Sequence, residues 1–288
     1  MASLDLLVIV GQTASGKSAL AMEIAERCNG EIIAADSRTV YRGMDIGTAK
    51  PTVEDQAKVP HHLLDVVSPD QPFTAADFQR LANEAIENIQ SRGKMPILVG
   101  GTGLYVDSVI YNFSFAGEAD QELRVELEGL SIEELQQRIT VEGLIMPENT
   151  QNKRYLVRTL ERGDQPLEKR SLDAGTVVVG LKIPKEVLEE RIKARLDQML
   201  ADGLLEEVKA LKDQYGQERL EAMTGTTYKV LGKYLDNEID LEEAKAEIIR
   251  GDLSLAKRQL TWFKRHDADI HWFDSAPKAQ EYIMSVCI

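Results

Sequence analysis

The stretch from Gly11 to Ser18 limits most strongly what this chain can fold into, because it reads G-Q-T-A-S-G-K-S. It matches the pattern G-x-x-x-x-G-K-[ST], a glycine-rich loop that binds phosphate. The apolar run Leu6 to Val10 before it predicts a buried parallel strand, and the helix formers Ala19 to Arg27 after it predict a helix. A strand, a loop and a helix in this order are the context in which such a loop holds a di- or triphosphate.

Each part of this loop has a predicted role. The glycines let backbone N–H groups turn toward an anion, and the N-terminus of the helix adds partial positive charge. Lys17 is placed to reach outer phosphate oxygens, and the Ser18 hydroxyl is placed to hold Mg²⁺, which is the predicted cofactor. The predicted phosphate-binding residues are Gly11, Gln12, Thr13, Ala14, Ser15, Gly16, Lys17 and Ser18.

Further apolar runs predict the rest of a core sheet. Strands are expected at Glu31 to Asp36, Pro96 to Val99 and Thr176 to Ile183. Apolar residues at helical spacing predict a helix over Thr74 to Arg92. Together these elements predict an α/β fold, with a P-loop NTPase-like parallel sheet flanked by helices. Asp36 ends its strand at the edge where open α/β sheets bind ligands.

Several residues bear on metal binding. The strand before Thr102 is followed by glycines, so it lacks the acidic residue with which many P-loop ATPases hold Mg²⁺. The adjacent His61 and His62 fit either a metal site or hydrogen bonding at a strand edge, and the second is favoured because no third ligand stands nearby. Cys28 and Cys287, the only cysteines, are interpreted as reduced thiols because two cysteines form no zinc cluster by themselves.

The composition is that of a soluble protein. Of the 288 residues 43% are hydrophobic and 28% are charged, and no apolar run approaches the length of a membrane span. The N-terminus lacks a basic and apolar signal segment, so we expect a cytoplasmic protein without membrane contact. A formal net charge of −14 argues against general attraction to nucleic acid but leaves room for local basic surfaces.

The composition changes between residues 113 and 174, where charged helical patterns replace the apolar strands. We predict a helical insert there, within a core domain of residues 1–112 and 175–288. Its first half is acidic; its second half is basic and contains Lys153, Arg154, Arg158, Arg162, Lys169 and Arg170. Arg154, Arg158 and Arg162 fall on one helix face, which indicates either a solvated surface or one that faces phosphate.

Two basic groups follow the last core strand. Arg191 and Arg195 lie one helical turn apart, as either a phosphate clamp or a solvated pair. The run Lys257 to Arg265 has four basic residues, two aromatic residues and no acidic ones, a combination that suits nucleic-acid backbones and bases. Its Trp262 fits a base-contacting role and a core role equally well.

The order of motifs resembles that of the bacterial tRNA dimethylallyltransferase family. The resemblance covers most of the chain and is far more specific than the phosphate loop alone. Besides that loop it rests on Asp36-Ser37 with Val40-Tyr41, Met44 to Pro51, Pro60 to Asp65, Val99 to Tyr105, Arg158 to Glu161 and Lys257 to Trp262.

The resemblance implies transfer of a dimethylallyl group from dimethylallyl pyrophosphate to the exocyclic N6 amine of the adenine just 3′ of the anticodon in tRNA. The implied partners are therefore dimethylallyl pyrophosphate and the tRNA anticodon stem-loop, and we expect the protein to act as a monomer. The implied catalytic residues are Asp36 as general base, Lys17 and Thr102, and Arg195 is expected to contact phosphate. The implied tRNA-binding residues are Asp36, Ser37, Arg38, Thr39, Thr102, Arg124, Lys153, Arg154, Arg158, Lys229, Lys257, Arg258, Gln259, Trp262 and Lys264. The stretch Thr224 to Lys229 resembles a further tRNA-contacting segment.

The chain departs from the family pattern in two places. The insert lacks much of the usual pattern between Gln136 and Asn152, and Thr227 stands where the family usually has glycine before Tyr228. Three other functions remain as alternatives: an adenylate isopentenyltransferase acting on free nucleotides, an ATP-binding small-molecule or nucleotide kinase, and a GTPase-type switch. The switch is least favoured, because the run after Asn152 lacks the Asp of a guanine-reading N-K-x-D motif.

Overall fold

The computed structural model describes residues 4–115, 121–147, 149–163, 171–219 and 225–287. Contacts divide the chain into a first unit of residues 1–111 and 172–288 and a second unit of residues 112–171. Lys169 and Arg170 of the basic half of the insert, and Thr224 of the stretch Thr224 to Lys229, lie outside the described residues.

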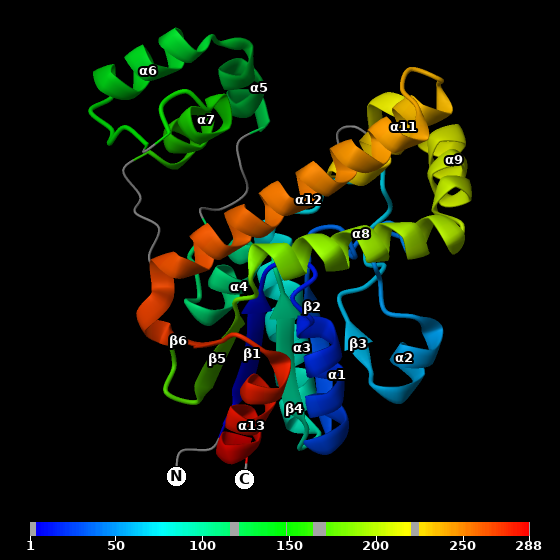
Figure 1. The fold of residues 1–288 in the computed structure, drawn as a ribbon. Coiled ribbons are helices and arrows are strands. Elements are labelled where there is room, and N and C mark those ends of the chain that lie inside the picture. The colour runs from blue at the N-terminus through cyan, green and yellow to red at the C-terminus, as the bar shows by residue number, and fades with distance from the viewer. Residues whose placement is uncertain (1–3, 116–120, 148, 164–170, 220–224, 288) are drawn as a thin grey trace. The chain divides into compact units, whose positions relative to one another are not determined.

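The first unit is built on a parallel sheet of six strands in the order β3-β2-β4-β1-β5-β6, which confirms the predicted α/β fold (Figure 1). The strands are β1 (Leu6–Gly11), β2 (Gly30–Ala35), β3 (His61–His62), β4 (Met95–Gly100), β5 (Thr176–Leu181) and β6 (Ile270–Phe273). Every residue of β1 and β2 is buried, as continuous apolar strands of a parallel sheet require. In register, Val8 of β1 lies between Leu98 of β4 and Val178 of β5.

Helices cover both faces of this sheet. The helices nearest to it are α1 (Lys17–Arg27), α3 (Ala75–Ser91), α4 (Gly103–Ile110) and α13 (Ala276–Cys287), and the short α2 (Val53–Lys58) precedes β3. On one face α1 and α13 pack through Ile24 and Ile283 against Leu7 and Ile9 of β1. Side chains alternate along a strand, so Val8 points to the opposite face. The predicted helix over Thr74 to Arg92 is α3, which contacts β2 and β4 and begins at a Thr74–Asp77 capping box.

A second layer of helices belongs to the same unit: α8 (Lys185–Ala201), α9 (Leu204–Tyr215), α11 (Thr226–Leu235), the long α12 (Leu241–Phe263) and the 3₁₀ turn η1 (Lys264–Asp269). In Figure 1 α8 and α12 run above the upper ends of the strands. Leu196, Val208, Leu231 and Ile248, one from each of the four helices, share a core that also contains Met44 from the loop after β2. Pro184 is the N-cap of α8, with an extended ψ of 145°, and the helix begins at the next residue.

The second unit contains α5 (Gln121–Gly129), α6 (Ile132–Val141) and α7 (Lys153–Arg162). These helices pack around Leu127, Leu135, Ile139, Leu156 and Leu160. α6 begins at a Ser131–Glu134 capping box and α7 at Asn152, whose side chain accepts from the backbone N–H of Arg154. None of the helices in the described ranges of either unit combines the length and apolar character of a membrane span.

Candidate active site

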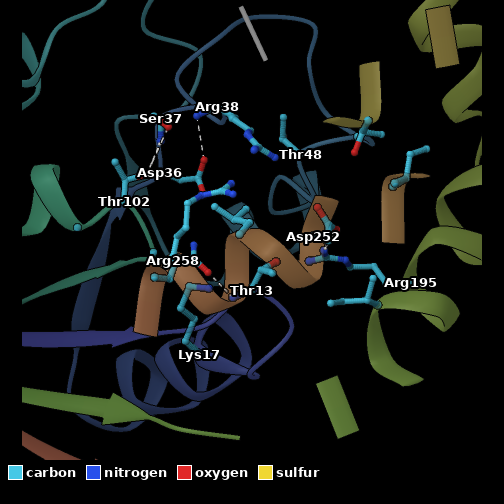
Figure 2. Close-up of a pocket in the computed structure, with 18 of the residues that line it drawn as sticks. Thr13, Lys17, Asp36, Ser37, Arg38, Thr48, Thr102, Arg195, Asp252 and Arg258 are labelled. Carbon is cyan, nitrogen blue, oxygen red and sulfur yellow. Dashed lines mark hydrogen bonds and ion pairs between the residues drawn. The ribbon is translucent and has the colours of Figure 1, made fainter. Parts of the chain in front are cut away.

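A pocket of about 340 Å³ opens at the carboxyl edge of the sheet, and all the residues lining it belong to the first unit (Figure 2). The loops after the strands, together with the first residues of α1 and α4, contribute Thr13, Lys17, Asp36, Ser37, Arg38, Gly47, Thr48, Gly101, Thr102, Gly103 and Leu104. The helices contribute Ile192, Arg195, Leu196, Met199, Thr227, Ile248, Asp252, Leu255, Arg258, Gln259 and Trp262. β2 and β1 both border β4, so the parallel order brings the loops after these three strands together.

The phosphate loop of residues 11–18 has the backbone conformation that its glycines predict. Gly16, just before α1, has a φ of +93°, which only glycine adopts without strain. Gly11 lies so close to β5 that a Cβ there would stand 2.8 Å from the carbonyl oxygen of Leu181. The guanidinium of Arg191 in α8 donates to the carbonyl oxygens of Ala14 and Ser15, both at 3.2 Å. Arg191 was interpreted as part of either a phosphate clamp or a solvated pair. In the structure its side chain binds the backbone of the phosphate loop.

Two glutamine side chains brace the phosphate loop from within. Gln12 Oε1 accepts from the backbone N–H of Ile183 at 3.0 Å, and Gln259 Oε1 accepts from the backbone N–H of Thr13 at 2.7 Å. Gln12 and Gln259 are 6% and 8% exposed, so little of either side chain faces solvent. Gln259 of α12, predicted to bind tRNA, therefore connects α12 to the phosphate loop in this structure.

Lys17 is the cation of the loop. Its Nζ donates to the carbonyl oxygen of Gln12 at 3.2 Å, and its side chain lines the pocket. Burial lowers the pKa of Lys17 to about 8; Asp36 opposes this shift and Arg195 adds to it. A desolvated ammonium group that lines the pocket gains from a bound anion, which would stabilise its charged form.

Asp36 and Thr102 follow β2 and β4 and lie close together at one end of the pocket. Asp36 Oδ1 accepts from the backbone N–H of Arg38 at 2.8 Å, which fixes the carboxylate at the start of its loop. Thr102 Oγ1 accepts from the backbone N–H of Ser37 at 3.1 Å and donates to the Ser37 hydroxyl at 3.4 Å. Figure 2 shows Thr102 beside Ser37, and Lys17 on another side of the pocket.

Helix α12 contributes both charge and an aromatic ring. Asp252 Oδ2 accepts from the Arg195 guanidinium at 2.8 Å, so the predicted phosphate ligand Arg195 is held by a carboxylate at the pocket wall. Trp262 lines the pocket, and its indole Nε1 donates to the buried carboxylate of Asp107 at 2.9 Å. Of the two aromatic residues in this run, Phe263 is the core residue, at 1% exposure.

Other predicted residues lie outside the pocket lining. Thr39 is 6% exposed, whereas Lys257 and Lys264 are exposed on the surface and Lys229 is half-buried. Arg258 does line the pocket and donates to the Ser254 hydroxyl at 2.7 Å. Thus the structure gathers the phosphate loop, Asp36 to Arg38, Thr102, Arg195, Arg258, Gln259 and Trp262 around one space.

Arg124, Lys153, Arg154 and Arg158 belong to the second unit. There Arg124 Nε donates to Glu128 at 3.1 Å, and Lys153 Nζ donates to the Glu128 carbonyl oxygen at 2.7 Å. Burial and then the neighbouring Arg154 lower the pKa of Arg158. Like charges crowd at this point of α7, which makes the group suited to an anionic partner.

The histidine pair has ordinary hydrogen-bonding partners. His61 Nδ1 lies 2.8 Å from the Val59 carbonyl oxygen, and His62 Nε2 lies 2.8 Å from Glu31 Oε2. The buried Glu31 carboxylate also accepts from Arg92 and Lys94, and hydrogen bonding to Arg92 above all holds its pKa far below the usual range. These contacts are the strand-edge hydrogen bonds of the favoured interpretation, and in the described ranges no three His, Cys, Asp or Glu side chains gather as a metal site.

Sequence reasoning did not single out Asp252, Asp107 or Glu207, and it placed Tyr228 only within a stretch that resembles a tRNA-contacting segment. Asp107 and Asp252 hold pocket side chains, and Glu207 and Tyr228 hold the pocket loop around Gly47. Each acts on a partner far away in the chain, so no local motif could have revealed it.

Comparisons with known proteins agree with this geometry. The family model for IPP transferase matches residues 39–266. The tRNA dimethylallyltransferases of Moorella thermoacetica and Streptococcus mutans are 43% and 44% identical to this chain, over 96% and 91% of it and 92% and 90% of their own lengths.

Solved structures are similar as well. The full-length tRNA isopentenylpyrophosphate transferase of Bacillus halodurans matches with a TM-score of 0.75 at 38% identity, over 99% of this chain and 97% of its own. A eukaryotic dimethylallyltransferase acting on tRNA matches with a TM-score of 0.77 at 25% identity, over 93% of this chain and 73% of its own. The chain belongs to the tRNA dimethylallyltransferase (IPP transferase) family.

Proposed function

We propose that the pocket transfers a dimethylallyl group from dimethylallyl pyrophosphate to the N6 amine of the adenine 3′-adjacent to the anticodon in tRNA, releasing pyrophosphate. The function is that of the family to which the chain belongs. One observation assigns this function to the pocket: three kinds of surface line it together. They are the phosphate loop, the carboxylate of Asp36, and an apolar wall from α8 and α12 that includes Ile192, Leu196 and Leu255. A pyrophosphate, an acceptor amine and a short hydrocarbon chain need these surfaces side by side.

The phosphate loop stabilises the leaving group. As the C–O bond breaks, negative charge grows on pyrophosphate, and the Lys17 ammonium and the loop N–H groups meet that charge in place. The Ser15 hydroxyl, 1% exposed and without a hydrogen-bond partner among the described residues, is available to the same anion. Loop geometry and the buried cation therefore both favour departure of pyrophosphate.

The acceptor side needs a base, because the lone pair of an adenine amine is delocalised into the ring. Asp36 takes the proton from the amine as the C–N bond forms. The amine approaches the allylic carbon from the side opposite pyrophosphate, which a base stacked in the anticodon loop cannot do. The adenine is therefore flipped into the pocket, where Thr102 and Trp262 line its path.

The residues present also fit Mg²⁺. The Ser18 hydroxyl is exposed at the start of α1, next to Lys17, and the carboxylate of Asp36 lines the pocket. Both groups are the hard oxygen donors that this ion prefers. A Mg²⁺ ion held there would supply neutralisation of charge on the pyrophosphate. Ser18 and the loop N–H groups would hold and orient this complex, while Lys17 supplies the fixed protein charge.

The tRNA backbone is held by basic side chains, of which Arg258 lines the pocket and the others lie outside its lining. On α12 and η1 these are Lys257, Arg258 and Lys264, and on the second unit Arg124, Lys153, Arg154 and Arg158. We also propose that the protein acts as a monomer.

The test supplies labelled dimethylallyl pyrophosphate with unmodified tRNA, with AMP and with ATP in separate reactions. We expect label in tRNA alone, and mass spectrometry of the anticodon loop should place it on the adenine 3′ of the anticodon. Labelled AMP or ATP would instead establish an adenylate isopentenyltransferase. Mass measurement of the protein by light scattering tests the monomer.

A further inference from the structure

One wall of the pocket is a loop that belongs to neither the phosphate loop nor the long helices. This loop, residues 44–50, begins at the fully buried Met44 and places Gly47 and Thr48 on the pocket, on the same side as Asp36 and Arg38. Figure 2 shows Thr48 beside Arg38, with Lys17 well separated from both. The 44–50 loop therefore borders the part of the pocket in which the proposed function places the adenine.

A single carboxylate from α9 holds this loop by its backbone. Glu207 Oε2 accepts from the N–H groups of Asp45 at 2.9 Å and Ile46 at 2.7 Å. Glu207 Oε1 accepts from the N–H of Gly47 at 3.0 Å and from the hydroxyl of Tyr228 at 2.7 Å. Three consecutive N–H groups form a nest for an anion, and here a side chain of the same protein occupies that nest.

Tyr228 of α11 completes the arrangement. It is 2% exposed, and a Cβ on Gly47 would stand 2.6 Å from its ring, so Gly47 packs flat against it. Burial and the Glu207 carboxylate raise the pKa of Tyr228, which keeps the hydroxyl protonated as a donor. Only a residue without a side chain fits between Tyr228 and the pocket, so Gly47 and Tyr228 are sterically matched.

The far end of the loop is held by Lys50. Lys50, with 3% of its side chain exposed, donates to Asp45 Oδ1 at 2.5 Å, to Asp65 Oδ1 at 2.6 Å and to the Tyr41 carbonyl oxygen at 2.9 Å. Lys50 thus ties the 44–50 loop to itself and to the loops that carry Tyr41 and Asp65, whereas Glu207 ties its backbone to α9. Loss of Glu207 leaves the Lys50 contacts and the buried Met44 in place and removes the hydrogen bonds to the N–H groups of residues 45–47.

We propose that Glu207 is a positioning residue for transfer: it holds the 44–50 loop as the wall against which the acceptor nucleotide is placed. The inference rests on the proposed function and assigns a role to a side chain that touches no substrate. Its physical basis is that misplacing a substrate-contacting wall by about 1 Å can reduce the rate about 10²-fold.

The test compares Glu207→Gln with Glu206→Gln, its exposed neighbour on α9. An amide at position 207 points an N–H₂ donor at groups that are themselves donors, so at least part of the nest is lost. Deuterium uptake of the peptide covering residues 44–50, measured without substrate, should rise in Glu207→Gln and stay unchanged in Glu206→Gln. The value of kcat/KM for tRNA should fall about ten- to hundredfold, with KM for dimethylallyl pyrophosphate within about twofold of wild type.

Tyr228→Phe provides a milder second variant, because it removes one donor and keeps the ring against Gly47. We expect a smaller fall in kcat/KM for tRNA, in the same direction and with the same selectivity between substrates. Wild-type exchange in Glu207→Gln, or faster exchange with unchanged kcat/KM for tRNA, would overturn the proposal. So would equal losses for both substrates together with a lowered melting temperature, which would indicate general destabilisation. Absence of transfer by the wild-type protein would contradict the proposed function instead, and the exchange measurement would still decide whether Glu207 holds the loop.

Discussion

Two loops face each other across the pocket, and they are held in different ways. The phosphate loop runs directly from β1 into α1, and the positive φ of Gly16 lies within the loop's own motif. The 44–50 loop takes its shape from Glu207, whose carboxylate comes from 162 residues beyond Asp45. The site of the leaving group is thus encoded locally, whereas the site of the acceptor depends on how the helical layer packs.

The distinction is not complete, because tertiary contacts also reach the phosphate loop. Gln259 and Arg191 bond to its backbone from α12 and α8. The two loops therefore differ in degree. The phosphate loop has a conformation set by its own sequence, which contacts from α8 and α12 stabilise further. The 44–50 loop has a conformation that is set by its contacts with Glu207. Variants at each of the two loops should distinguish local from tertiary stabilisation of the loop conformation.

The largest effect is expected at the acceptor side itself. Asp36→Asn keeps the shape of the side chain and an acceptor for the Arg38 N–H, but it cannot take a proton at neutral pH. Single-turnover transfer should fall about 10²–10⁴-fold, while affinity for tRNA changes less than about tenfold. Retention of most of the transfer rate would show that the base lies elsewhere, and a parallel collapse of binding would show that Asp36 mainly holds the adenine.

At the leaving-group side, Lys17→Ala should reduce single-turnover transfer about 10²–10³-fold, because one electrostatic contact to the developing charge is worth roughly 2.7–4 kcal/mol. Circular dichroism should show an unchanged fold. Near wild-type transfer would contradict the assigned role.

The same lysine makes this side sensitive to pH. Its pKa of about 8 in the folded protein lies below the ordinary 10.5, so between these values the unfolded chain binds more protons. Lys17 by itself therefore makes the folded state more stable as pH rises through that range. Binding needs the charged form, so pyrophosphate affinity should fall by up to about tenfold per pH unit above pH 8. Titration calorimetry with Lys17→Ala as the reference isolates this dependence from the titration of pyrophosphate.

Gln259→Ala measures how far the phosphate loop depends on its tertiary brace. The change leaves the buried N–H of Thr13 without its partner, which should lower the free energy of unfolding by about 1–3 kcal/mol. Pyrophosphate affinity should fall less than in Lys17→Ala. Urea unfolding and calorimetry test both expectations; a loss of affinity as large as that of Lys17→Ala would mean that the loop has no stable local shape.

The smallest expected effect is on the salt dependence of tRNA binding, and it involves residues outside both loops. Replacing the exposed Lys264 and Arg265 by Ala should flatten the slope of log K for tRNA against log salt by about 0.7–0.9 for each phosphate that these side chains neutralise. Transfer at saturating tRNA should stay close to wild type. An unchanged slope would show that these side chains face solvent when tRNA is bound.

The sequence by itself determined the elements whose causes are local. Continuous apolar runs predicted β1, β2, β4 and β5, and the Thr74–Asp77 capping box of α3 was visible as a threonine followed by an aspartate three residues later. Glycine at the positions that need positive φ made the phosphate loop recognisable, and the succession of motifs identified the family. These features need only neighbours along the chain, so a pattern of letters carries them.

The tertiary structure alone decided how the rest of the pocket is closed. No periodicity marked Trp262 as a pocket residue held by Asp107, Arg195 as the partner of Asp252, or Glu207 as the anion beneath the 44–50 loop. Each of these contacts joins side chains or backbone groups that come together only when α8, α9 and α12 pack around the sheet edge. A carboxylate that binds backbone N–H groups needs no particular residue type in its partner, so the sequence carries no pattern for it.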